Sequence, residues 1–142
     1  IYGYDDNWND LPAETINHGT THIAFSPEAI VNNAFSYEYQ GWFARLSTQF
    51  VGAQYMSNAD VEAHKLDAYC VSNLDLAYTF TPAKAFKAIT LGATVYNLFN
   101  EKYENNGWAS SNYLNTPDQL VNYTGYAAQA GTNFLAHVTF KF

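Results

Sequence analysis

The sequence predicts an all-β chain whose antiparallel strands form part of a transmembrane β-barrel. Three observations support this fold class: an unusual composition, a period of two along several segments, and connections that alternate between short and long. Aromatic residues make up 18% of the 142 positions and charged residues only 13%, whereas an ordinary globular domain has about 25% charged residues. Apolar residues diluted by Asn, Thr, Ser and Gln suit strands with one apolar and one hydrated face.

The predicted elements begin with a loop over residues 1–19, where Asp, Asn, Pro and Gly occur without a regular period. A short strand is expected over residues 20–25, followed by a turn at residues 26–28. Apolar and polar residues then alternate over residues 31–39, and again from residue 42 to about residue 55. Alternation of this kind predicts strands and not helices.

The second half of the chain repeats the pattern. A polar loop over residues 58–66 precedes an alternating segment at 73–80, and another alternating segment follows at 89–96. The longest loop is expected over residues 101–131, which are rich in Asn, Gly, Ser and Tyr. The final strand, residues 134–142, has the clearest alternation, because every even position in it is apolar.

Short and long connections alternate as they do in outer-membrane barrels. The turns at Gln40-Gly41 and at residues 81–84 are short, whereas the loops at 58–66 and 101–131 are long. Each alternating segment has roughly 10 residues, the length of a tilted strand that crosses a bilayer. Aromatic residues near the strand ends fit the girdles found at membrane interfaces. A soluble β-sandwich predicts the same alternation and is the alternative fold.

One side of these strands is predicted to face lipid. Phe134, Ala136 and Val138 share a face of the final strand, and Leu74 and Leu76 share a face of an earlier one. We predict that these five side chains contact hydrocarbon, while the residues between them point into an aqueous interior. The chain opens without the basic and apolar segments of a secretory signal. We therefore expect it to be a fragment of a larger exported protein.

The sequence argues against several function classes. A formal net charge of −7 does not suit nucleic acid, which requires a basic surface. With one cysteine, Cys70, no disulfide can form within the chain. The sequence contains no run of about 18 apolar residues, so it predicts no transmembrane helix. We recognise no paired nucleophile and base, phosphate loop or cofactor motif, and so predict neither enzyme activity nor a cofactor.

Metal binding is the less favoured interpretation of the histidines and acids. His18 and His64 lie in predicted outer loops, where they would be the candidates for capture of haem or a metal, but no histidine pair has metal-ligand spacing. Asp5, Asp6 and Asp10 offer oxygen ligands for Ca²⁺ but lack the spacing of an EF-hand. A hydrated loop is therefore the favoured interpretation of the acidic cluster.

Ligand contacts are expected in the predicted outer loops, where aromatic rings lie among Asn residues. Such rings stack on sugars or on other ring-containing ligands, and neighbouring polar groups supply hydrogen bonds. Packing within the loop, or contact with lipid headgroups, is the alternative for each ring. The candidates are Trp8, His64, Trp108, Tyr113 and Tyr123.

Several motifs in combination resemble the C-terminal barrel strands of TonB-dependent outer-membrane receptors. The run Asn97-Leu98-Phe99-Asn100, followed by Tyr103, resembles the penultimate-strand motif of that family. Segments 23–27, 50–55 and 65–69 resemble receptors of the Bacteroidetes type. The ending over residues 130–142 resembles the final strand of the family. The resemblance covers nearly the whole chain from residue 20 onward.

The resemblance implies a barrel of roughly 22 strands with a plugged lumen. This chain would supply about six C-terminal strands over residues 20–142 and an outer loop at residues 1–19, and the plug domain would lie outside it. In that family an aromatic C-terminal residue serves as a barrel-assembly signal, a role that falls here to Phe142 with Phe140. The implied location is the bacterial outer membrane.

The resemblance also implies a function: uptake of a scarce nutrient such as a siderophore, haem, cobalamin or an oligosaccharide. The implied partners are the rest of the barrel and its plug, the TonB complex, outer-membrane lipid and the nutrient, with a surface lipoprotein as an optional further partner. Two other functions stay open. One is a porin or adhesin barrel without a plug, and the other is a soluble lectin-like β-sandwich that uses the loop aromatics.

Overall fold

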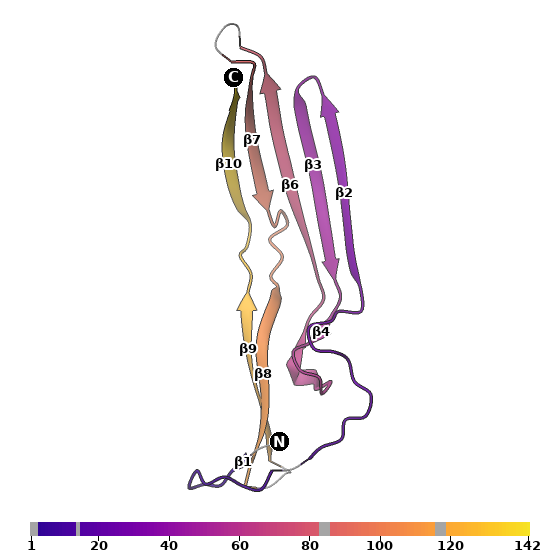
Figure 1. Ribbon diagram of the computed structural model, residues 1–142, viewed down its shortest axis with the longest axis vertical. Helices are drawn as coiled ribbons and strands as arrows, with labels where there is room; N and C mark the ends of the chain where they lie inside the picture. Colours follow the sequence, from indigo (N-terminus) through magenta and orange to yellow (C-terminus); the bar gives the residue numbers. More distant parts are fainter. Residues whose placement is uncertain (1–2, 14, 83–85, 116–118) are drawn as a thin grey trace. The chain divides into compact units, whose positions relative to one another are not determined.

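The computed structural model of the chain is all-β, as the sequence predicts. It describes residues 3–13, 15–82, 86–115 and 119–142, and over these ranges the one helical element is a single 3-10 turn, η1. Within the same ranges no helix is long and apolar enough to cross a membrane. In chain order the elements are β1 (Gly3–Tyr4), β2 (Ile30–Tyr39), β3 (Trp42–Val51), β4 (Gln54–Tyr55), η1 (Glu62–His64), β5 (Lys65–Leu66), β6 (Tyr69–Phe80), β7 (Ala88–Tyr96), β8 (Glu104–Leu114), β9 (Leu120–Ala128) and β10 (Asn133–Lys141) (Figure 1).

Two compact units make up the chain, and each is described by itself. The sheet unit comprises residues 29–52, 68–103 and 129–142, whereas the loop unit comprises residues 1–28, 53–67 and 104–128. Each unit is therefore assembled from three segments that are separated in the sequence, and the chain passes between the units several times.

The sheet unit is a single five-stranded antiparallel sheet in the order β10-β7-β6-β3-β2 (Figure 1). Its strands have 9 to 12 residues, against about five or six in soluble proteins. The strands predicted near residues 31–39, 73–80, 89–96 and 134–142 are confirmed. The sheet has five strands instead of about six. It is open at β2 and β10, and no strand in the described ranges closes it, so the barrel stays a prediction.

The β2–β3 hairpin shows how the local sequence sets strand register. Gln40 and Gly41 connect the paired residues Tyr39 and Trp42, with φ angles of 46° and 87°. Positive φ at both central residues is typical of the type I′ turn, whose twist suits a two-residue hairpin. The turn predicted here is confirmed. The turn predicted at residues 81–84 falls partly outside the described residues.

The register places alternate residues of all five strands on common faces. Residues that pair directly across antiparallel strands point to the same side of the sheet. Leu46 pairs with Leu74, Leu74 with Val95, and Val95 with Phe134. This row of side chains crosses four strands and is apolar throughout, so the alternation seen along each strand is in phase across the sheet.

The loop unit contains a second hairpin where the sequence predicts a loop. β8 and β9 pair antiparallel, with a β-bulge between Glu104 and Asn106 (Figure 1). The prediction of one long loop over residues 101–131 is therefore wrong. Both faces of this hairpin carry Asn and Ser, so hydrophobic alternation, the signal that located the other strands, is weak here. The predicted loop 1–19 likewise contains a short strand, β1, which pairs in parallel with β8.

The segment at residues 20–25 is not a strand, which contradicts the prediction. Two of its backbone N–H groups donate to side chains, and a third, that of Phe25, donates to the carbonyl of Tyr55. The N–H of His22 donates to the carboxylate of Asp60, and the N–H of Ala24 donates to Oδ1 of Asn58. The strand expected to run from residue 42 to about 55 also ends early: β3 stops at Val51, and β4 then pairs with β5.

Candidate functional site

The candidate functional surface of the sheet unit is its apolar face. All five residues predicted to face lipid lie on it, because the register puts Leu74 and Leu76 on the same side as Phe134, Ala136 and Val138. The exposed fractions of Phe134, Val138 and Leu76 are 80%, 52% and 43%. Ala136 is also exposed, and Leu74 is half-buried. None of these side chains lies in a sealed core.

Charged side chains are confined to the opposite face. The five strands of the sheet contain four charged residues: Glu38, Arg45, Asp75 and Lys141. The register places every one of them between the apolar positions, on the face referred to below as the polar face. His137 lies on the polar face as well. The two faces therefore differ in charge as well as in hydrophobicity.

The apolar face carries one polar patch, formed by Asn33, Thr48 and Ser72. Asn33 pairs with Thr48, and Thr48 pairs with Ser72, so the three side chains lie in one row across β2, β3 and β6. The hydroxyl oxygens of Thr48 and Ser72 are 2.8 Å apart and share a hydrogen bond, and Ser72 is buried. Mutual hydrogen bonding lowers the cost of placing hydroxyls on an otherwise apolar surface.

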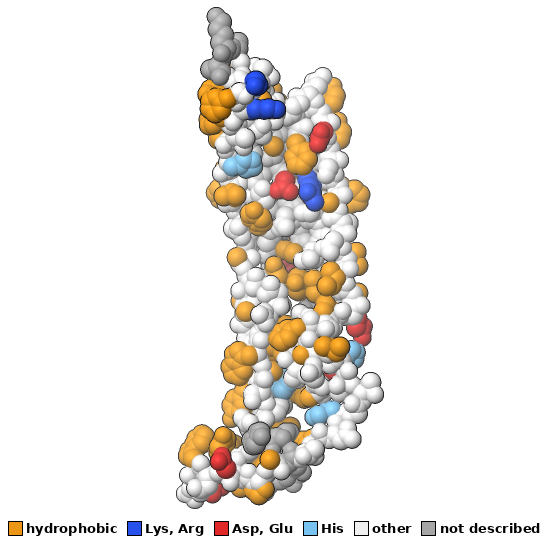
Figure 2. All heavy atoms as spheres, viewed as in Figure 1, with side chains coloured by type: hydrophobic (Ala, Val, Ile, Leu, Met, Phe, Trp, Pro, Cys, Tyr) orange, Lys and Arg blue, Asp and Glu red, His pale blue; other side chains and the backbone are white. Residues whose placement is uncertain are grey.

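The polar face has its own hydrogen bonds and a shallow hollow. Thr94 Oγ1 donates to Asp75 Oδ1 at 2.7 Å, and the hydroxyls of Thr79 and Thr90 are 2.8 Å apart. In Figure 2, a few acidic and basic side chains are visible in the upper part of the view, among hydrophobic ones. The hollow has a volume of about 400 Å³. Six of its lining residues have side chains on the polar face: Asn32, Ala34, Arg45, Ser47, Gln49 and Asn73; the other two, Asn33 and Thr48, have theirs on the apolar face. Amide and hydroxyl groups thus dominate this part of the polar face.

Aromatic rings gather at the end of the sheet where the β2–β3 turn lies. Ring centroids are 4.6 Å apart for Trp42 and Tyr78, and 6.4 Å apart for Tyr37 and Tyr39. The two residues predicted to form the assembly signal also lie in an aromatic cluster, because the ring of Phe86 is 5.2 Å from Phe140 and 5.0 Å from Phe142. These contacts agree with the predicted position of one girdle.

The Asn97–Asn100 motif forms a junction that sequence reasoning located without explaining. Asn97 is buried and has a φ of 49°. Its side chain donates to the carbonyls of Glu101 and Ala130, and its Oδ1 accepts from the N–H of Glu101. Its carbonyl accepts from the hydroxyl of Thr132, and Asn100 Oδ1 accepts from the Thr132 N–H. One asparagine thereby ties the exit of β7 to the entrance of β10.

Three of the five predicted ligand residues have accessible rings, and all three lie in the loop unit. The exposed fractions of Trp8, Trp108 and Tyr123 are 80%, 61% and 44%. Trp108 and Tyr123 lie on the β8–β9 hairpin, and Trp8 lies near Tyr4, with ring centroids 5.9 Å apart. The prediction that they bind a ligand is neither supported nor opposed by exposure alone, but their rings are available for contact.

His64 and Tyr113 are instead buried in the small core of the loop unit. His64 has an exposed fraction of 2%, and its two ring nitrogens lie 3.0 Å from Ser57 Oγ and 3.3 Å from Ser111 Oγ. Tyr113 has an exposed fraction of 5%, and its hydroxyl donates to the carbonyl of Pro12. Both side chains are occupied by contacts within the chain, so this structure gives them a structural position and presents neither to a ligand.

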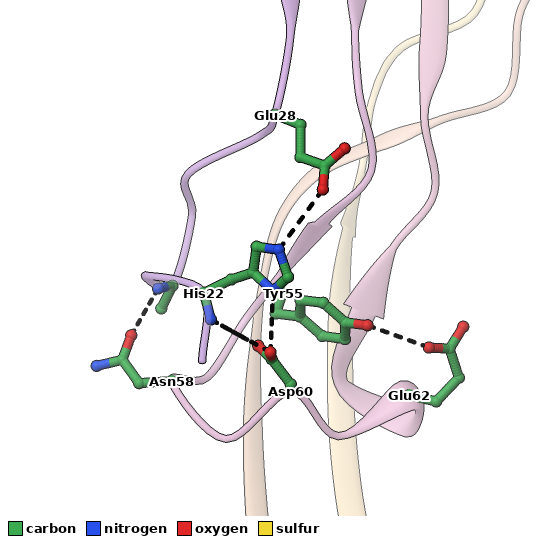
Figure 3. Close-up of polar contacts among 7 residues, drawn as sticks. His22, Glu28, Tyr55, Asn58, Asp60 and Glu62 are labelled. Atoms are coloured by element: carbon green, nitrogen blue, oxygen red, sulfur yellow. Dashed lines mark hydrogen bonds and ion pairs between the residues drawn. The ribbon is translucent and has the colours of Figure 1, made fainter. Parts of the chain in front are cut away.

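A polar cluster around His22 joins two segments of the loop unit (Figure 3). The ring Nδ1 of His22 lies 2.9 Å from Asp60 Oδ2, and its Nε2 lies 3.5 Å from Glu28 Oε1. The ring stacks on Tyr55 with centroids 5.7 Å apart, and the Tyr55 hydroxyl donates to Glu62. The hydrogen bond to Asp60, with the negative charges of Asp60 and Glu28, raises the pKa of His22 above its ordinary value.

The acidic cluster near the beginning of the chain is organised by its own hydrogen bonds. Asp5 accepts from the backbone N–H groups of Asn7 and Asn9 and from the side-chain amide of Asn9. The hydrogen bonds from Asn9 lower the pKa of Asp5 below its ordinary range. Across the residues that the structure covers, no group of three or more His, Cys, Asp or Glu side chains is arranged to hold a metal ion. Asp5 therefore shapes a turn of the backbone.

Comparison with protein-family models, curated proteins and solved structures finds no match to this chain.

Proposed function

We propose that this chain forms part of the wall of a TonB-dependent outer-membrane receptor, which takes up a scarce nutrient. In this proposal the sheet unit crosses the outer membrane with its apolar face toward lipid and its polar face toward the lumen. The rest of the barrel continues from the two open edges, β2 and β10. The β8–β9 hairpin and the other segments of the loop unit form outer loops that contribute to ligand capture.

The observation that carries the membrane part is the separation of charge between the two faces. A soluble sheet with one exposed face places charged residues on that face and buries the other under a second layer. Here the uncharged face is the one with exposed Phe134, Val138 and Leu76, and the sheet unit contains one sheet among its described strands. An exposed apolar face of this extent requires an apolar partner, and hydrocarbon is a partner that fits all five strands.

Strand length and hydrogen bonding agree with this proposal. Strands of 9 to 12 residues match the length needed to cross a bilayer at a tilt. The backbone ladder is continuous from β10 to β2, which a lipid environment demands because it offers no water to unpaired N–H and C=O groups. The receptor part of the proposal is supported by the resemblance of the Asn97–Asn100 motif and of the final strand to that family.

The membrane part can be tested with spin labels, since the single cysteine is easily replaced. In a Cys70→Ala background, nitroxides are attached to cysteines introduced one at a time at positions 73 to 78, and the chain is refolded into phosphatidylcholine vesicles. Collision with oxygen should be greatest at Leu74, Leu76 and Tyr78, whereas collision with a water-soluble nickel chelate should be greatest at the positions between them. Absence of this alternation, or a chain that stays monodisperse in buffer without detergent, would overturn the proposal.

The receptor part is tested by the coding sequence upstream of this chain. A plug domain preceded by a TonB-interacting segment is expected. A barrel continuing upstream without a plug would identify a porin or an adhesin and would refute the receptor assignment while leaving the membrane assignment intact.

A further inference from the structure

The β8–β9 hairpin carries an aromatic platform built over a glycine. Trp108 pairs with Gly125 across the hairpin, and a Cβ atom at position 125 would overlap three atoms of the Trp108 indole. The indole therefore lies directly on the backbone of β9, in space that any other residue would fill. Its exposed fraction is nonetheless 61%, so one side of the ring is backed by the backbone while much of the ring stays open.

A recess lies beside this platform. Its volume is about 310 Å³, near the lower end of the range for ligand pockets, and its lining residues are Asn106, Gly107, Trp108, Gly125, Tyr126 and Ala127. The Asn106 side-chain oxygen accepts from the N–H of Gly107, which fixes the amide at the recess and leaves its N–H₂ group as a donor. The ring available at the recess is that of Trp108, because Tyr126 pairs with Gly107 and its side chain points to the opposite face of the hairpin.

The platform is held from the other side of the hairpin. Gly107 pairs with Tyr126 and faces away from the Trp108 indole. A Cβ atom at position 107 would overlap the sulfur of Met56, so this buried side chain packs against the bare backbone there. Two glycines thus allow an indole and a thioether to lie against the two faces of one hairpin. The rigid backing reduces the entropy that Trp108 would lose on binding a ligand.

We propose that this recess binds a pyranose ring of a neutral carbohydrate, with the C–H face of the sugar on the Trp108 indole. The inference rests on the proposed function and deepens it by naming the ligand class. No lining residue is charged, which disfavours anionic ligands, since these need Arg or Lys partners, and the net charge of −7 repels them further. An apolar ligand would need an enclosed cavity, whereas an open recess with one ring face and an amide at its edge suits a sugar ring with polar edges.

The test uses Trp108 as its own reporter. The chain has three tryptophans, so the double variant Trp8→Phe and Trp42→Phe leaves Trp108 as the single one. The detergent-solubilised full chain is titrated with neutral hexamers of glucose, mannose and xylose, and with a hexamer of galacturonic acid as the charged counterpart. A saturable change in Trp108 fluorescence is expected for at least one neutral hexamer. The affinity for the charged hexamer should be about tenfold weaker or more.

The variant Gly125→Ala distinguishes loss of the Trp108 platform from loss of the hairpin fold. It keeps every aromatic ring but adds a methyl group in the space of the indole, so the affinity should fall by about tenfold. Ser110→Ala is the matched control: Ser110 lies on the same strand and face as Trp108, the substitution also changes one non-hydrogen atom, and it should leave the affinity unchanged. Circular dichroism checks that both variants keep their strands. Should Gly125→Ala lose its strands, Trp108→Phe, which keeps a ring but shrinks the platform, should still weaken binding several-fold.

Two results would overturn the inference: no saturable response to any neutral hexamer, or equal affinities for Gly125→Ala and Ser110→Ala. Because binding is measured in detergent, it does not depend on insertion into a bilayer. A normal spin-label alternation without a sugar response refutes the carbohydrate site alone. A sugar response without the alternation supports the site and refutes the membrane proposal.

Discussion

The sheet unit and the loop unit satisfy their backbone hydrogen bonds in different ways. In the sheet unit, strands of 9 to 12 residues pair with one another over most of their length. In the loop unit, the β8–β9 hairpin also pairs through its backbone, but elsewhere the side chains of Asp5, Asn58 and Asp60 accept several of the backbone N–H groups. The structure of the sheet unit therefore depends on the environment of its two faces, whereas the structure of the loops depends on hydrogen bonds to a few particular side chains.

The largest effect on stability is expected from a charge on the apolar face of the sheet unit. Leu76→Arg should lower the free energy of unfolding in vesicles by about 2–4 kcal/mol, because a guanidinium near the centre of the bilayer is poorly solvated. The matched variant Ser47→Arg puts the same side chain on the polar face, beside the amide-lined hollow, and should cost far less. Urea titrations of both variants measure the difference, and equal losses would show that the two faces are not distinct in environment.

A somewhat smaller effect is expected where the sheet unit depends on one side chain. Asn97→Ala removes three side-chain hydrogen bonds and puts alanine at a φ of 49°, so we expect a loss of about 2–3 kcal/mol. Asn97→Gly loses the same three bonds but adopts a positive φ without strain, so its loss should be intermediate. A change below about 0.5 kcal/mol for Asn97→Ala in the same urea titration would mean that the junction has no structural role.

The smallest effect is a pH dependence confined to the loop unit. Because the pKa of His22 is raised in the folded chain, its contact with Asp60 stabilises fully below the ordinary histidine pKa of about 6.5. The contribution is lost as the pH rises through the raised value. An NMR titration of the His22 ring should give a midpoint above 6.5, and Asp60→Asn should bring it back toward the ordinary value. Asp67→Asn, which removes a carboxylate from the same region without contacting His22, should leave the midpoint in place; a midpoint unaffected by Asp60→Asn would refute the contact.

The sequence was informative where one physical signal dominated. A period of two with an apolar face located the five long strands, and Gln40-Gly41 located the hairpin turn between two of them. The face of each lipid-facing candidate followed from the same period, since pairing in register preserves it. The closed barrel and the receptor assignment stay predictions, because the described sheet ends in two open edges.

Prediction failed in two places: where a strand is built largely of polar residues, and where polar side chains take the place of a neighbouring strand as hydrogen-bond acceptors. The β8–β9 hairpin has Asn and Ser on both faces, so it has the composition of a loop. Residues 20–25 have the composition of a strand, but two of their N–H groups bond to the side chains of Asn58 and Asp60, more than 30 positions away. His64 and Tyr113 are buried with partners that are also distant in the sequence, Ser111 and Pro12 respectively. A local pattern carries no information about partners of this kind.

The junction at Asn97 has a consequence for how such a chain can change over time. Its hydrogen bonds join residues 97–101 to residues 130–132, and the N–H of Gln129 donates to the carbonyl of Tyr103. These hydrogen bonds therefore hold the ends of β7 and β10 together on either side of residues 104–128, independently of what those residues form. Insertions, deletions or wholesale exchange of the hairpin can be tolerated without a shift in the pairing of β7 with β10. A lineage could thus replace one hairpin, and with it the exposed rings of Trp108 and Tyr123, while inheriting its five-stranded sheet unaltered.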